Sequence, residues 1–315
     1  MKKILIGGSP YTRWSIAQKN NRETEAEGIG WELFRNYLIA KEKFQPDFFL
    51  YENNKSAAQP IKDQISKELG VPLQYINSAL VSAQNRERFY AHNIPNVTQP
   101  EDRNIYLEDI VQHDINHTYL YKHRQEYSNY DKRKVDKTIH PITAIQIGMS
   151  KQFVCSTNSY GKAFTVRAAC PNGILDADYQ IRMYTVTECC RLQTMPDNYC
   201  DVANKTQALK GLGNGWTAEV IIHILKHMNI PLDEEIVVLS MYDGIGTGRY
   251  CFDKMGYTNV TYHAYEIDKY AMQIAMSNYP DIIQHGDAFQ VRNEDWSIGK
   301  AAPAPTGNGS HEKTH

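Results

Sequence analysis

Apolar runs and amphipathic stretches alternate over the first ninety residues of the chain. The stretches 2–8 (KKILIGG) and 48–54 (FFLYENN) are dense in apolar residues, as expected of buried strands. Between them, residues 30–44 place apolar side chains at helical spacing, and residues 61–70 (IKDQISKELG) form an amphipathic stretch closed by a glycine. A further strand is expected at 73–82. This βαβαβ order is typical of one half of a doubly wound sheet.

The same alternation returns in the last third of the chain, where a threonine suited to cap a helix precedes the first helical pattern. The expected elements are a helix at 185–195, a helix at 218–228, a strand, glycine-rich turn and helix at 235–256, a strand at 260–268, a helix at 270–279 and a strand at 282–289. We therefore predict an α/β protein built on a doubly wound, Rossmann-like sheet.

The middle of the chain, residues 96–180, has a different character. Residues 117–137 (HTYLYKHRQEYSNYDKRKVDK) mix tyrosines with lysines and arginines, and no long helix or repeating strand pattern stands out. We interpret this part as a separate, smaller domain. The predicted division is 1–95, 96–180, 181–296 and a Pro/Gly/Ser-rich tail at 297–315 that we expect to be disordered.

Composition narrows the classes of function without selecting one. The 34 Lys and Arg residues nearly balance the 36 Asp and Glu residues, so contact with nucleic acid would need a local basic patch. Six cysteines show no paired metal-ligand spacing, and the adjacent Cys189 and Cys190 have an awkward geometry for a disulfide, so we expect reduced thiols and no metal. The start MKKILIGG is too poor in apolar residues for a signal peptide, and no run reaches membrane-spanning length, which indicates a cytoplasmic protein without membrane contact.

A nucleoside-binding pattern stands near the end of the chain. The segment DGIGTG follows a strand and opens a helix, where glycines let a ligand approach the backbone. An acid ends the next strand about twenty residues later, where it would accept hydrogen bonds from ribose hydroxyls, and another ends a third strand. Taken singly, the turn is as often structural and each acid is more often a solvated strand end, but together they favour a site. The residues assigned to it are Asp243, Gly244, Gly246, Gly248, Glu266 and Asp287.

Six short motifs resemble those of one family, the DNA (cytosine-5) methyltransferases. IGGSPY is similar to the family's catalytic-loop motif GGxPC, YENN to its ENV motif and QNRER to its QxRxR motif. TVTECCRLQTMPDNY resembles its TxxExxRLQxFPD segment, GLGNGWT its GNG/S-x-T segment, and DGIGTG its cofactor loop. The matches cover most of the chain outside 96–180.

The resemblance implies a reaction and the residues that perform it. In the family a cysteine thiolate adds to cytosine C6, and C5 then takes a methyl group from S-adenosyl-L-methionine. By position in the motifs, Glu52 would bond N3 and the amino group of the base, Arg88 would contact O2, and Arg86 would support it. Asn214 of GLGNGWT joins the cofactor-binding set. The alternatives are a strand-end acid for Glu52, and phosphate contacts or surface charges for the two arginines.

Tyr11 stands where the family has its nucleophilic cysteine. A phenol has a pKa of about 10 against about 8.5 for a thiol, so only on the order of a thousandth of it is ionised at neutral pH. None of the six cysteines lies in this loop, and Cys189 and Cys190 are expected to be packed structural residues. Three explanations stay open: a pseudo-enzyme that binds DNA and cofactor without methyl transfer, altered chemistry on the flipped base, or a single substitution in an active lineage.

The order of the motifs differs from that of the typical family member, in which the cofactor motifs precede GGxPC. This resembles a circular permutation, which requires only that the former connection lay at the surface. Residues 96–180 stand in the place of the family's target-recognition domain, and their Tyr, Lys and Arg residues suit contacts to double-stranded DNA, with a solvated aromatic surface as the alternative. The resemblance thus implies a cytoplasmic methyltransferase, of the kind found in restriction-modification, that flips a cytosine out of the duplex.

Overall fold

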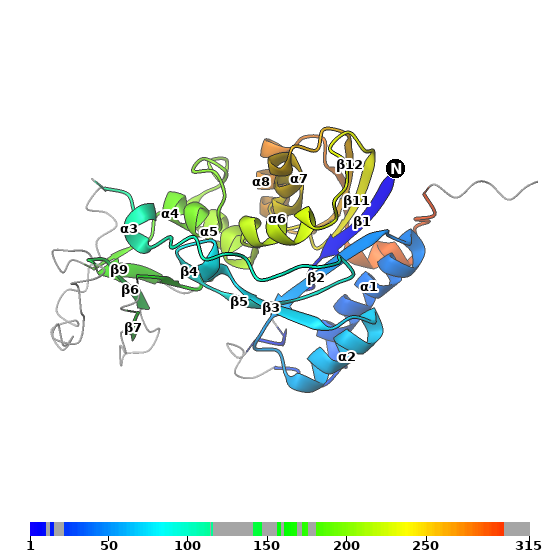
Figure 1. The fold of residues 1–315 in the computed structure, drawn as a ribbon, viewed down its shortest axis with the longest axis horizontal. Helices are drawn as coiled ribbons and strands as arrows, with labels where there is room; N and C mark the ends of the chain where they lie inside the picture. Colours follow the sequence, from blue (N-terminus) through cyan, green and yellow to red (C-terminus); the bar gives the residue numbers. More distant parts are fainter. Residues whose placement is uncertain are drawn as a thin grey trace, which may run out of the picture.

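A seven-stranded, mainly parallel sheet forms the centre of the molecule (Figure 1). The structure, a computed structural model, describes residues 1–10, 13–15, 22–113, 115, 141–146, 156–158, 161–168, 172–175 and 181–298. In sheet order the strands are β13 (Ile283–Gly286), β12 (Val260–Tyr265), β11 (Ile236–Met241), β1 (Lys2–Gly7), β2 (Phe48–Asn54), β5 (Glu87–His92) and β3 (Leu73–Asn77). Neighbours from β13 to β2 run parallel, whereas β5 is antiparallel to both strands beside it.

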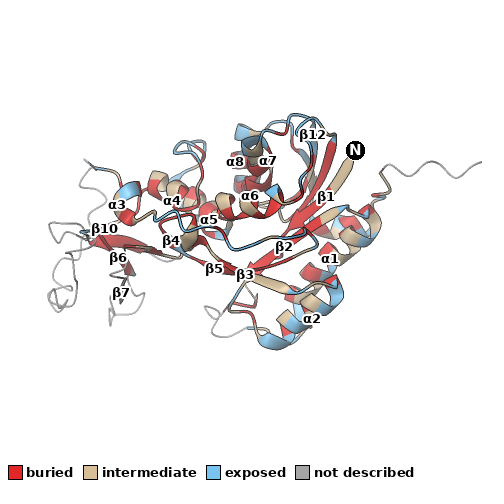
Figure 2. Ribbon diagram, viewed as in Figure 1, coloured by how far each residue is buried: buried red, intermediate tan, exposed pale blue. Residues whose placement is uncertain are grey.

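Helices cover both faces of this sheet (Figure 1). One face carries α1 (Gly28–Phe44) and α2 (Gln59–Leu69), and the other carries α6 (Ala218–Lys226), α7 (Thr247–Met255) and α8 (Lys269–Asn278). Side chains alternate along β1, so Ile4 and Ile6 belong to one apolar cluster and Leu5 to the other. Figure 2 shows the central strands buried, as expected of a sheet covered on both sides.

Polar side chains define where the helices beside the central sheet begin. Thr185 caps α4 (Val186–Leu192): its hydroxyl accepts a hydrogen bond from Glu188 N, and the Glu188 carboxylate accepts one from Thr185 N. α5 (Lys205–Asn214) begins after Asn204, whose side chain accepts a hydrogen bond from a backbone N–H of the first turn. The helix predicted after a threonine cap is therefore confirmed.

A smaller antiparallel sheet lies at the end of the molecule away from the N-terminus (Figure 1). In sheet order its strands are β10 (Ile181–Met183), β9 (Asn172–Leu175), β6 (Thr143–Gln146) and β7 (Ser156–Asn158). A short parallel ladder between β4 (Gln84–Asn85) and β8 (Ala163–Phe164) connects this region to the segment that precedes β5. The remaining short elements are η2 (Ser78–Leu80), α3 (Leu107–Ile110) and η6 (Ala288–Arg292).

The predicted α/β class is confirmed, as are most of the predicted elements, but several boundaries differ. The strand expected at 73–82 ends at Asn77, because the Asn77 side chain accepts a hydrogen bond from Ala79 N and starts η2. The strand expected at 282–289 ends at Gly286 and is followed by η6. No helix in the described part of the chain has both the length and the apolar composition needed to cross a bilayer.

Several predictions fall on residues outside the described part of the chain. These are the nucleophile position Tyr11, the Tyr/Lys/Arg stretch 117–137 and nearly all of the tail at 297–315. The domain boundaries likewise stay predictions.

Candidate active site

One cavity of about 240 Å³ lies at the C-terminal ends of the central parallel strands. In an open α/β sheet this is the edge at which ligands bind. Segments after β1, β2, β11 and β12 line it together with α5 and the turn that follows α5. The lining residues are Gly8, Ser9, Pro10, Glu52, Gln207, Lys210, Gly211, Asn214, Gly215, Trp216, Tyr242, Asp243, Gly244, Thr247, Glu266, Asp268, Tyr270 and Ala271.

The loop after β1 brings the GGSP segment into this cavity. Gly8 passes so close to β2 that an added Cβ atom would lie 2.6 Å from the Glu52 carbonyl oxygen. The Ser9 hydroxyl lies 2.7 Å from the Tyr51 hydroxyl, and the Asn53 amide donates to the Ser9 carbonyl oxygen at 3.0 Å. The two neighbours of Glu52 in the YENN segment therefore hold the loop in place.

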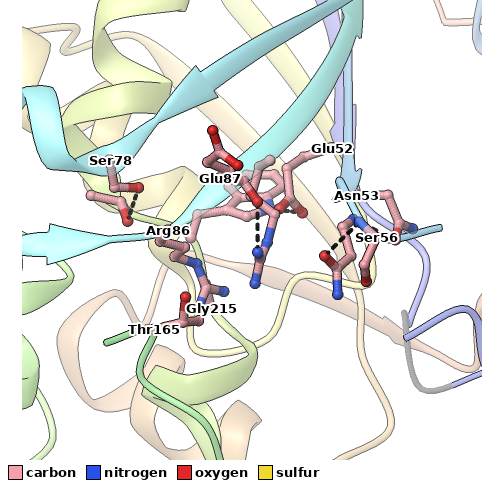
Figure 3. Close-up of polar contacts among 12 residues, drawn as sticks. Glu52, Asn53, Ser56, Ser78, Arg86, Glu87, Thr165 and Gly215 are labelled. Atoms are coloured by element: carbon pink, nitrogen blue, oxygen red, sulfur yellow. Dashed lines mark hydrogen bonds and ion pairs between the residues drawn. The ribbon is translucent and has the colours of Figure 1, made fainter. Parts of the chain in front are cut away.

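Glu52 lies near the C-terminal end of β2 (Figure 3), and its carboxylate has one ion-pair partner and one hydrogen-bond donor. Arg88 Nε lies 3.1 Å from Oε1, and the Trp216 indole Nε1 donates to Oε2 at 3.1 Å. Glu52 and Arg88 are 8% and 6% exposed, so water screens this ion pair little. Each carboxylate oxygen has two lone pairs and keeps acceptor capacity for a ligand. The structure thus brings the predicted Glu52 and Arg88 into direct contact.

Arg86 has a different environment from Arg88. Its guanidinium is buried and donates to three backbone carbonyl oxygens, those of Val166 at 3.2 Å, Gly213 at 3.4 Å and Gly215 at 2.8 Å. Figure 3 shows its side chain extending toward Gly215. These bonds tie the segment after β8 and the turn after α5 to the segment before β5. Arg86 therefore supports the cavity wall without lining the cavity.

Asp243 begins the glycine-rich turn after β11. Ser240 Oγ and Tyr262 Oη donate to its Oδ1 at 2.7 and 2.6 Å, whereas its buried Oδ2 has no hydrogen-bond partner within the described part of the chain. Burial raises the pKa of Asp243 to about 6. Gly244 has a φ of +64° and open space where a side chain would begin, so a ligand can reach the backbone there.

Glu266 follows β12 and braces the same turn. Its carboxylate accepts hydrogen bonds from the backbone N–H groups of Gly244 at 2.8 Å, Ile267 at 2.9 Å and Asp268 at 2.8 Å. Oε2 accepts only one of these bonds, so a lone pair remains there for a ligand hydroxyl. The Ile267 side chain is 72% exposed, the highest value among the exposed large hydrophobic residues of the described chain. An exposed apolar side chain beside this carboxylate suits the face of a planar base.

The other predicted cofactor residues lie in different surroundings. Asn214 lines the cavity. Gly246 has a φ of +80° and directly precedes α7, whereas Gly248 is buried against Tyr262, where the missing side chain lets α7 pack on the sheet. Asp287 is exposed, caps η6 and does not line the cavity. The structure thus gathers the ends of β11 and β12 at the cavity and leaves the end of β13 outside it.

Sequence reasoning predicted Asn214 but missed the rest of the face of α5 that lines the cavity. Gln207, Lys210, Gly211 and Asn214 have the spacing i, i+3, i+4 and i+7, which places them on one side of a helix. Lys210 Nζ lies 2.6 Å from the Asp268 carboxylate, so an ion pair connects α5 to the start of α8. The only signal in the sequence was this polar and glycine spacing, because α5 has no clear apolar stripe.

The polar groups of the cavity fit S-adenosyl-L-methionine by their chemistry. The unpartnered Asp243 Oδ2 suits a cationic or N–H-bearing group, Glu266 suits ribose hydroxyls, and the open backbone at Gly244 permits close approach. In the same cavity, Glu52 presents an acceptor, and the Arg88 guanidinium paired with it lies directly behind, as the polar edge of a base requires. Among the described residues, no group of three His, Cys, Asp or Glu side chains is arranged to hold a metal ion.

The comparison with protein families agrees with this chemistry. A family model described as C-5 cytosine-specific DNA methylase matches residues 1–229. Similar solved structures include a DNMT2 variant from Spodoptera frugiperda, at 15% identity over 72% of this chain and 79% of that chain with a TM-score of 0.43. Another is the Dnmt2 methyltransferase of S. pombe, at 14% identity over 67% of this chain and 77% of that chain with a TM-score of 0.38. No curated protein matches the chain.

Proposed function

Because the chain belongs to the C-5 cytosine-specific DNA methylase family, we propose that it is an S-adenosylmethionine-dependent methyltransferase directed at cytosine C5 in double-stranded DNA. The observation that supports this most is one cavity lined both by Glu52, which pairs with Arg88, and by Asp243 and Glu266. Two ligands bound there would lie side by side, as a group transfer between them requires.

In this proposal Glu52 and Arg88 hold the target base. The carboxylate accepts hydrogen bonds from the amino group of cytosine, and the guanidinium donates to the ring carbonyl O2. Uracil has a carbonyl oxygen in place of the amino group, so it would face the Glu52 carboxylate with a second acceptor and bind poorly. A base reaches a pair this buried only after it has left the duplex stack.

The bound cofactor would supply an electrophilic methyl group. The residues of this chain that would hold it are Asp243, Gly244, Glu266 and Asn214, with Ile267 packing on the adenine face. Asp287 stays a predicted adenine contact on the neighbouring strand end, although it does not line the cavity.

Tyr11 limits methyl transfer in this proposal. Pro10, its neighbour in the chain, lines the cavity. A phenol that is almost entirely protonated at neutral pH adds poorly to C6 of cytosine, so we expect slow transfer or none. A second candidate, a DNA- and cofactor-binding protein without methyltransferase activity, is favoured by the same residue, and another modification of the flipped base is the third.

Binding of S-adenosyl-L-methionine tests the proposal without relying on activity. Calorimetry on the full chain should show binding, and Glu266→Gln should weaken it by about tenfold, because a charged acceptor for the ribose hydroxyls is lost. Glu234→Gln is the matched control, since Glu234 pairs with the N-terminal amine at the opposite end of β1. Absence of binding, or equal losses in the two variants, would remove the cofactor assignment.

A further inference from the structure

A second cavity lies across α5 from the first. It has a volume of about 280 Å³ and is lined by residues of β9, β10, α4 and α5. Gln207 and Lys210 of α5 line the first cavity, whereas Lys205 and Leu209 line the second. The proposed function uses none of the residues of this second cavity.

Two residues that line the second cavity each carry a buried polar atom without a hydrogen-bond partner within the described part of the chain. The atoms are Asn172 Oδ1 and Tyr184 Oη, on residues that are 6% and 4% exposed. The Asn172 amide nitrogen donates to Thr165 O at 2.8 Å, which leaves Oδ1 as the atom available to a ligand. Burial raises the pKa of Tyr184, so its hydroxyl stays protonated and can donate. Two such atoms on residues that line one cavity indicate a ligand that satisfies both.

The remaining lining residues define the chemistry of that ligand. Arg167 and Lys205 bring positive charge, and Met183 and Leu209 bring apolar surface. A ligand that satisfies all of them has a flat apolar body, an edge with a donor for Asn172 and an acceptor for Tyr184, and an anionic group. A nucleobase edge offers donors and acceptors side by side, and its phosphate supplies the charge. A simple anion would offer Asn172 no donor, and an apolar ligand would leave both polar atoms unpaired.

We propose that the second cavity binds a nucleotide with its base inward, and that this nucleotide belongs to the DNA strand that carries the target cytosine. The assignment of this nucleotide to DNA rests on the proposed function. Both cavities are lined by residues of α5, and a helix with its side chains is roughly 10 Å across. About three nucleotides of a stacked strand, at about 3.4 Å each, span that distance. The protein would therefore hold two bases of one strand, one on each side of α5.

Tyr184→Phe provides the main test, because it removes the unpaired hydroxyl and keeps the ring. Binding of the four deoxynucleoside monophosphates and of short single-stranded oligonucleotides would be measured by calorimetry on the full chain. We expect at least one monophosphate to bind about five- to tenfold more weakly to Tyr184→Phe, since one hydrogen bond is lost. Tyr184→Phe should also raise the Tm of the free protein, because a buried hydroxyl without a partner is gone. Glu52→Gln should leave the binding of the two purine monophosphates unchanged, because the proposed function assigns only cytosine to Glu52.

The oligonucleotides separate the two sources of a nucleotide. If the nucleotide comes from DNA, an oligonucleotide that reaches both cavities binds much more tightly than any monophosphate, and both Tyr184→Phe and Glu52→Gln weaken it. If a free nucleotide is the ligand, the monophosphate binds as tightly as the oligonucleotide, which overturns the DNA source. Monophosphate binding that is absent, or equal in the parent chain and Tyr184→Phe, overturns the second site. If Tyr184→Phe weakens oligonucleotide binding but Glu52→Gln does not, the proposed function is contradicted and the second site is not.

Discussion

The two partners of the Glu52 carboxylate come from segments that are far apart in the chain. Arg88 lies on the neighbouring strand, whereas Trp216 is 164 residues away. The ion pair and the hydrogen bond orient the carboxylate before any ligand arrives, so a base that fits can bind without first ordering the side chain. Trp216 is therefore a positioning residue for Glu52, as well as part of the wall that faces the cofactor turn.

Trp216→Phe should loosen this arrangement, because it keeps an aromatic ring and removes the indole N–H. We expect the preference of the protein for cytosine-containing over uracil-substituted mixed-sequence DNA to fall by about five- to tenfold, in line with one hydrogen bond to a charged group. Fluorescence anisotropy with the two DNAs measures this ratio. Trp31→Phe is the control, since Trp31 stacks on Phe34 of α1 instead. An unchanged ratio would show that the Trp216 contact does not direct Glu52.

Asp243 should make cofactor binding depend on pH. Its pKa is raised from 3.8 to about 6 by burial, so the folded protein takes up a proton there as the pH falls toward 5. If the cationic cofactor needs the ionised form, its affinity at pH 5 should be about tenfold lower than at pH 7.5, because one pKa unit corresponds to a factor of ten. Calorimetry at the two pH values measures this ratio. Asp243→Asn should abolish the difference, and equal affinities in the parent chain would exclude this role for Asp243.

The stability of the folded protein should depend on the pH in the opposite direction to the cofactor affinity. A carboxyl whose pKa is raised on folding stabilises the folded state most when it is protonated, and that contribution is lost as the pH rises through about 6. Asp243→Asn should therefore raise the Tm more at pH 7.5 than at pH 5. A thermal shift that is the same at both values would mean that Asp243 is not buried as a neutral acid.

At the scale of elements, buried polar side chains join the segments that surround the cavity. Gln84 donates to Leu192 O at 3.0 Å, and Thr217 donates to Gln193 at 2.9 Å. Arg86 adds three bonds to carbonyl oxygens of the segments after β8 and α5. Motifs that are distant in the sequence therefore meet through their scaffold residues as well as through Glu52 and Arg88.

Arg86→Met should destabilise the fold by about 3 kcal/mol or more, because three carbonyl oxygens lose a charged donor in a buried position. Urea denaturation followed by circular dichroism measures the change in the free energy of unfolding. Arg35→Met is the control, since Arg35 forms an exposed ion pair with Glu32 and should change stability by less than about 0.5 kcal/mol. Equal effects of the two substitutions would contradict the scaffold role of Arg86.

The sequence predicted the central strands and most flanking helices because their apolar periodicity is strong. It did not predict α5, where two glycines and several polar residues hide the helical pattern, although the first cavity depends on that helix. It also did not predict β5 (Glu87–His92), which lies between β2 and β3, because its charged and aromatic residues show no clear strand period.

The candidate site, like the fold, was predicted from the sequence only in part. Motifs predicted which segments would meet, and Glu52, Arg88, Asp243 and Glu266 do lie around one cavity or in contact with its residues. The bond from Trp216 to Glu52 depends on the packing of distant segments, and no local pattern in the sequence indicates it. No local pattern indicates either that Asp287, which follows β13, lies outside the cavity.

At the scale of the whole molecule, the two halves of the cavity come from opposite ends of the chain. β1 lies at the centre of the sheet, with β11, β12 and β13 on one side and β2, β5 and β3 on the other. We infer from this order that the chain is a circularly permuted member of its family. In support, the family model matches residues 1–229 and stops before β11 and the DGIGTG turn.

Binding to duplex DNA should depend strongly on salt, although the whole chain carries a net charge of only −2. Released counterions make affinity fall steeply as salt rises, and each lost phosphate contact should reduce the slope of log affinity against log salt by about one. Reversing the charges of Lys132, Arg133 and Lys134 should therefore weaken binding across sequences and flatten the slope. Lys67→Glu on α2, which Figure 1 shows away from the small sheet, is the control. A slope equal to that of the parent chain in the triple variant would mean that another surface binds the DNA.

The transfer of a radiolabelled methyl group to mixed-sequence DNA tests the central claim most directly: a complete cytosine methyltransferase site that lacks only its nucleophile. Tyr11→Cys should exceed the parent chain by on the order of a hundredfold or more, because a thiolate restores attack at C6 while residual catalysis by the rest of the site stays small. Tyr11→Ser, which removes the ring without adding a thiol, should stay near the parent level. Transfer by the parent chain at a rate equal to that of Tyr11→Cys, or no transfer by Tyr11→Cys although it binds both DNA and cofactor, would contradict this account.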